Sequence, residues 1–120
     1  MEERNRPRNI IPQVAIQRYE QTRQGNRLTD EGTLSENKSL AVGHGCYLSF
    51  EKNRLMMLAD SHPLIYFVRH DNQVIGNSSI DVGFKNTVAL FPDDNQLELI
   101  FKNAAKPNEG PIQIFITKNQ

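Results

Sequence analysis

The residue types with the most reactive chemistry gather around Cys46, the only cysteine of the chain. His44 precedes it by two residues, and in an extended segment the two side chains point to the same face. An imidazole beside a thiol can lower the thiol pKa and activate it as a nucleophile. Cys46 also lies in register with Leu48 and Phe50, which we assign to the core. The pattern therefore favours a buried cysteine that packs as a small apolar side chain.

The remaining metal and phosphate signals match no complete motif. His44, His62 and His70, taken with Cys46, lack the paired spacing of zinc ligands. The acidic turn at residues 93–95 lacks the spaced oxygen ligands of a calcium loop. The glycines at 43 and 45 are followed by a predicted strand, whereas a phosphate-binding loop leads into a helix. We expect no cofactor and no metal.

Charge and aromatic content argue against a dedicated nucleic-acid binder. Fourteen basic and fourteen acidic residues give a formal net charge of zero. Tyr47, Tyr66 and Phe67 could stack on bases, but no basic patch accompanies them in the sequence, so core packing is favoured. Basic charge does concentrate near the N-terminus, which keeps a nucleic-acid module as an alternative; its arginines would be Arg4, Arg6, Arg8, Arg18, Arg23 and Arg27.

The elements that must position these residues show a period of two. Apolar side chains alternate with polar ones in the segments that contain Val14 and Ile16, Leu97 and Leu99, and Ile112 to Ile116. Turn residues separate the segments at intervals of roughly 8–12 residues. The sequence predicts an all-β fold: one antiparallel β-sandwich or partly open barrel of roughly seven or eight short strands.

Two segments need separate treatment. Residues 54–60 contain good helix formers, and a short helix there is an alternative to the strand that we favour. The run from Leu64 to Val68 is the most apolar in the chain, and we interpret it as a central strand covered on both faces.

Polar segments at the start of the chain suggest where a partner binds. Residues 1–10 predict a flexible arm, followed by a single sandwich domain over residues 11–120. Residues 27–38 lack apolar periodicity and predict a long connection or a weakly paired edge, and long loops often carry function. Our candidate interaction residues are Arg4, Arg6, Arg8, Arg27, Asp30 and the acidic residue Glu31 beside Gly32.

Cysteine usage and hydropathy predict the compartment. One cysteine forms no intramolecular disulfide, and the first ten residues contain no apolar signal core. No apolar stretch approaches the roughly 20 residues that span a bilayer. We expect a cytoplasmic protein with no membrane contact.

These features lead to one leading hypothesis and two alternatives. The leading hypothesis is a non-enzymatic protein–protein interaction domain, acting as a structural subunit, adaptor or inhibitor, with a protein partner or as a homo-oligomer. A small-molecule-binding or hydrolytic domain centred on His44 and Cys46 is the first alternative. The second is the nucleic-acid module that uses the N-terminal arginines.

Overall fold

A computed structural model describes residues 13–22, 24–51, 54–90, 96–106 and 108–119. These residues form ten β-strands and no helix. The strands are β1 (Gln13–Thr22), β2 (Gly25–Ser35), β3 (Ser39–Gly43), β4 (Cys46–Glu51), β5 (Arg54–Ala59), β6 (Leu64–His70), β7 (Gln73–Ile80), β8 (Lys85–Leu90), β9 (Gln96–Asn103) and β10 (Ile112–Asn119).

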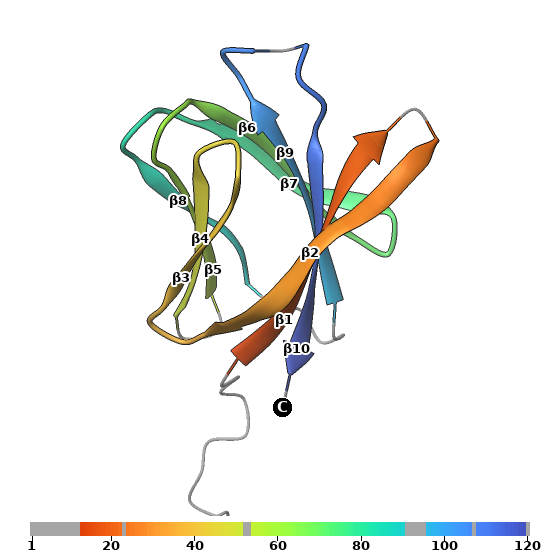
Figure 1. The fold of residues 1–120 in the computed structure, drawn as a ribbon. Helices are drawn as coiled ribbons and strands as arrows, with labels where there is room; N and C mark the ends of the chain where they lie inside the picture. Colours follow the sequence, from red (N-terminus) through yellow and green to blue (C-terminus); the bar gives the residue numbers. More distant parts are fainter. Residues whose placement is uncertain (1–12, 23, 52–53, 91–95, 107, 120) are drawn as a thin grey trace, which may run out of the picture.

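The strands form two antiparallel sheets that pack face to face (Figure 1). The larger sheet has six strands in the order β2-β1-β10-β9-β6-β7, and the smaller has four in the order β3-β4-β5-β8. The prediction of an all-β sandwich is confirmed. The strand count exceeds the predicted seven or eight. One reason is that residues 25–35 form a strand, in a region where a long connection was one of the two predicted alternatives.

Period-two alternation places one face of each strand in a shared core. The pattern of β9 is the clearest: Leu97, Leu99 and Phe101 are buried, while the residues between them are partly exposed. Burial of such side chains is the main favourable term in folding. The largest fully buried side chains come from both sheets and include Phe50, Phe101, Leu34, Leu48, Leu55, Met57, Leu64, Leu97 and Leu99.

Residues 54–59 form a strand, so the alternative of a short helix at 54–60 is wrong. Leu55, Met57 and Ala59 are buried, whereas the side chains between them are partly exposed. β5 lies between β4 and β8. Ladder hydrogen bonds on both sides, and a core that accepts every second side chain, override the helix propensity of the segment.

The prediction that the run from Leu64 to Val68 is covered on both faces is also wrong. In β6 the side chains of Leu64, Tyr66 and Val68 are buried, but Phe67 on the opposite face is 41% exposed. β6 is still an interior strand, between β9 and β7. Its apolar content supplies a partly apolar outer face to the larger sheet.

Two hairpins close with the same turn chemistry. His44 and Gly45 join β3 to β4 with φ values of 53° and 69°, and Asp71 and Asn72 join β6 to β7 with φ values of 52° and 65°. Positive φ at both central residues is the signature of the type I′ turn, whose twist matches that of paired strands. His44 therefore lies in a turn, and the extended conformation that would place its side chain on the same face as that of Cys46 is not present.

The sheets differ in width, and this leaves edge strands uncovered. Six strands cannot all be covered by four, and the strands left over are the two edges of the larger sheet. In β2 only Leu34 is buried, and in β7 only Ile80 is buried. In the part of the chain that the structure describes, no helix is long and apolar enough to cross a membrane.

Gly43 offers a test of this packing. Its φ is +110°, and an added Cβ would lie 2.5 Å from Cδ1 of Ile112. We expect Gly43→Ala to lower the free energy of unfolding by about 1–3 kcal/mol in urea titrations. The control Gly32→Ala, where an added Cβ meets nothing within 4 Å, should leave stability unchanged or raise it by up to about 1 kcal/mol. Equal effects of the two substitutions would contradict the packing described.

Candidate functional site

The exposed edge of the larger sheet is formed by β2. This strand has 11 residues, and all but Leu34 are exposed. It pairs with β1 along its whole length, and in Figure 1 the β1–β2 hairpin diverges from the smaller sheet toward its tip. Of the two readings of this segment, the paired edge is confirmed and the long connection is wrong. A long strand that buries one side chain contributes little to the core.

A β-bulge in β2 determines which way its charged side chains point. Arg18 pairs with Asp30 and Tyr19 pairs with Leu28, so Thr29 is the extra residue. Arg18 continues the inward series of Val14 and Ile16, which places Asp30 on the inner face of the sheet. A bulge of this kind re-aims side chains.

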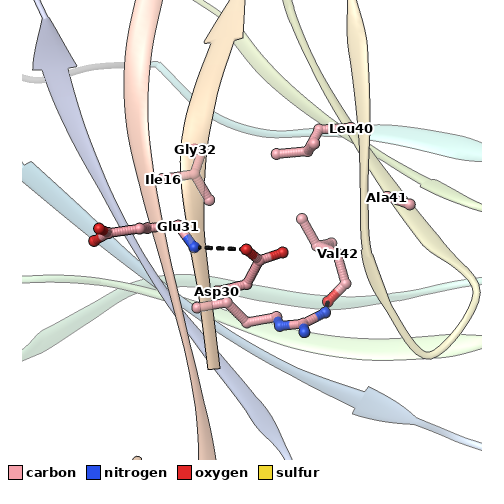
Figure 2. A pocket seen from close by; sticks show the side chains of 8 residues that line it. Ile16, Asp30, Glu31, Gly32, Leu40, Ala41 and Val42 are labelled. Carbon is pink, nitrogen blue, oxygen red and sulfur yellow. Dashed lines mark hydrogen bonds between the residues drawn. The ribbon is translucent and has the colours of Figure 1, made fainter. Parts of the chain in front are cut away.

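A small notch opens where β2 of the larger sheet lies beside β3 of the smaller one. Its volume is about 40 Å³, and its lining comes from β1, β2 and β3: Ile16, Arg18, Asp30, Glu31, Gly32, Leu40, Ala41 and Val42. Figure 2 shows Leu40 and Val42 facing the β2 segment across the notch. The Asp30 carboxylate points into it, whereas the Glu31 side chain points away. The notch thus has an apolar wall on β3 and two charged groups opposite it, the Asp30 carboxylate and the Arg18 guanidinium.

Arg18 fixes the floor of this notch. Its Nη1 donates to the Val42 carbonyl oxygen at 3.3 Å, and its Nε donates to the Thr29 hydroxyl at 3.0 Å. Nη2 lies 3.9 Å from a Glu20 carboxylate oxygen. The guanidinium therefore ties the bulge of β2 to β3. The Asp30 Oδ1 accepts the backbone N–H of Glu31 at 2.9 Å, which orients the carboxylate.

Half of the predicted interaction residues fall at this edge. Arg27, Asp30 and Glu31 are exposed on β2. Arg4, Arg6 and Arg8 lie outside the described residues. The apolar wall of the notch was not predicted, because Leu40 and Val42 belong to a strand of the other sheet, and the sequence does not show how the two sheets pack. The sequence signal that could have indicated the notch was Gly32, because a glycine inside a strand often marks a place where another group approaches closely.

His44 connects two loops and does not face Cys46 as a base. Its Nε2 lies 3.0 Å from the Gly110 carbonyl oxygen, and its Nδ1 lies 3.4 Å from a Glu109 carboxylate oxygen. The ring also packs edge-on against Phe101, with centroids 6.1 Å apart. Both ring nitrogens are thus engaged by the β9–β10 connection. The arrangement holds the two hairpin ends together.

Cys46 is a core residue, as its register with Leu48 predicted. It is 1% exposed, and burial raises its pKa to about 12. The thiolate is the nucleophilic form, so at neutral pH the thiol is inert. The geometry gives no support to a nucleophile at this position.

The other candidate constellations are not assembled. Among the described residues no three His, Cys, Asp or Glu side chains form a group able to hold a metal ion. The turn at 93–95 lies outside the described residues. Tyr66 is buried and its hydroxyl accepts from the Asn86 amide at 2.8 Å, while Phe67 lies on the opposite face of β6 and Tyr47 belongs to the smaller sheet. These rings share no common surface.

A polar chain that sequence reasoning missed crosses the outer face of the larger sheet. Asn26 Nδ2 donates to Gln113 Oε1 at 2.7 Å, and Gln113 in turn donates to Glu98. Arg69 Nη1 lies 3.4 Å from Glu98, and Arg69 Nη2 donates to the Asn72 side chain at 3.3 Å. Every member is paired, so we interpret the chain as a cross-strand support for the sheet. Such pairing depends on register and has no signature in a single sequence.

Comparison of the sequence with models of known protein families, with curated proteins and with solved structures found no match. Function must therefore be argued from the geometry of the chain itself.

The buried thiol predicts a pH dependence. Its pKa is higher in the folded state, so above about pH 9 the unfolded chain loses the proton while the folded chain keeps it. Stability should therefore fall as the pH rises from about 9 toward about 12. By about pH 11 the wild type should lose on the order of 2 kcal/mol more unfolding free energy than Cys46→Ala, measured in paired urea titrations. Parallel curves for the two proteins would contradict the burial of this thiol.

Proposed function

We propose that this chain is a non-enzymatic protein-interaction domain that binds its partner by strand addition along β2. The observation that carries the proposal is an 11-residue edge strand with a single buried side chain, beside a notch between the sheets. Strand addition uses backbone hydrogen bonds for affinity and pockets beside the edge for specificity. A single free cysteine in the core is consistent with a reducing, cytoplasmic setting.

The backbone of β2 offers a defined set of free groups. Thr22 pairs with Gly25 across a two-residue connection, and the pair that closes such a hairpin exchanges hydrogen bonds. Hydrogen-bonded pairs then alternate with pairs whose N–H and C=O groups point away from the partner strand. By this alternation the groups directed to the free edge belong to Asn26, Leu28, Glu31 and Thr33. The Glu31 N–H is already bound by Asp30 Oδ1, and an added strand must replace that hydrogen bond.

The notch supplies the specificity element. An added strand beside β2 brings its inward side chains over Leu40 and Val42 and next to Asp30. The Arg18 guanidinium in the notch is already engaged by Thr29, Val42 and Glu20. Asp30 and the apolar wall therefore favour a partner side chain with an aliphatic stem and a basic end. Arg27 shares its strand with Asp30 and Glu31, so β2 presents mixed charge and not the basic surface that nucleic acid requires.

A proline substitution tests the edge without disturbing the core. Thr33→Pro removes an N–H that points to the free edge, a position where a strand tolerates proline. We expect the folded variant, checked by circular dichroism and thermal melting, to lose proteins that the immobilised wild type retains from a cell extract. Mass spectrometry identifies the retained proteins, which can include further copies of this chain.

Ser79→Pro is the matched control. Ser79 occupies the equivalent outward position on β7, the other edge of the same sheet, because His70 and Gln73 close that hairpin. This variant should retain the same proteins as the wild type. Retention of those proteins by Thr33→Pro, or equal loss in both variants, would refute binding at β2.

A further inference from the structure

We propose that the partner of the β2 edge is a second copy of this chain. In this dimer β2 pairs antiparallel with its counterpart around a two-fold axis, and the two larger sheets become continuous. The inference rests on the function proposed above and names the partner of the same edge. It is argued from the register of β2, from the notch and from charge.

The bulge makes β2 self-complementary in one register. In a two-fold pair the outward-directed residues of one copy must meet those of the other. Placing Leu28 opposite Glu31 of the second copy also places Asn26 opposite Thr33 of that copy. All four residues share the outer face, because their β1 neighbours alternate with the buried Val14 and Ile16. The two-fold axis of this register passes between Thr29 and Asp30, and Thr29 of each copy lies opposite Asp30 of the other.

The same register places Arg27 of the second copy opposite Gly32. Both residues are on the inner face, because Arg27 pairs with Glu20 and Gly32 pairs with Ile16 in the inward series of β1. Gly32 lines the notch and contributes no side chain to it. The arginine stem would therefore lie over the apolar wall, and its guanidinium would reach the Asp30 carboxylate.

Neither backbone conformation nor close packing within one copy requires a glycine at position 32. Its φ is not positive, and an added Cβ would meet nothing within 4 Å. A glycine in a strand costs conformational entropy and commonly marks a close approach by another chain. In the proposed dimer, Arg27 of the second copy is the side chain that approaches Gly32.

Charge selects β2 over the other edge of the sheet. β2 carries one basic residue, Arg27, and two acidic ones, Asp30 and Glu31. In this register Arg27 of each copy lies on the inner face beside Asp30 of the other copy, and the two Asp30 carboxylates that flank the two-fold axis lie between the two arginines. β7 has no charged residue between Gln73 and Ile80, and an uncharged edge fixes register weakly. With a formal net charge of zero, two copies approach without overall repulsion.

Sedimentation equilibrium from about 10 μM to about 1 mM tests the dimer by charge exchange. The wild type should show a monomer–dimer equilibrium. Arg27→Glu and Asp30→Arg should each raise the dimer Kd about tenfold, because each places like charges together. The double variant restores the opposite pair and should return the Kd to within about threefold of the wild type.

A steric pair of variants completes the test. Gly32→Val fills the notch and should abolish dimerisation, while Gly76→Val, at an open position of β7, should leave it unchanged. A wild type that stays monomeric at the highest concentration, or a dimer indifferent to Gly32→Val, would overturn the inference. If the wild type is monomeric and Thr33→Pro still releases a different protein, only the identity of the partner is wrong and the proposed function stands.

Discussion

The mismatch in width between the two sheets is the constraint on which the rest of the structure depends. A sandwich buries one face of each strand against the opposite sheet, and four strands cannot cover six. The central strands of both sheets enclose the core, and the strands that remain largely uncovered are the two edges of the larger sheet, β2 and β7. The exposed hairpin, the notch beside β3 and the proposed strand addition all follow from the uncovered edge at β2.

His44 and Cys46, which in the sequence resemble a catalytic pair, have structural roles in the fold. His44 takes a positive φ in a type I′ turn, and its ring nitrogens hold the β9–β10 connection. Cys46 begins the next strand and lies in the core. His44 and Cys46 are only two residues apart in the sequence, but the fold places the imidazole against the β9–β10 connection and the thiol in the core. The absence of an activated nucleophile here is a consequence of where the turn falls.

The sequence allowed the core to be predicted where apolar residues alternate strictly, as in β9, and where a cysteine takes its place in such a series, as in β4. It failed at β2, which carries no apolar period because only Leu34 of this strand packs into the core. It also failed at Phe67, because a continuous apolar run looks the same whether the second face is buried or open. Arg27, Asp30 and Glu31 were predictable as a polar cluster. Their notch was not, because Leu40, Val42 and Arg18 reach it only through tertiary structure.

Amide hydrogen exchange, read residue by residue by NMR, tests most directly whether the β2 edge is free in one copy and used in association. In dilute protein the N–H groups of Leu28 and Thr33, which point to the free edge, should exchange as exposed amides do. They should slow by about tenfold or more when association occurs, while Asn77 and Ser79 of β7 stay fast throughout. Protection of Leu28 and Thr33 in the dilute chain, or fast exchange under all conditions, would contradict the account.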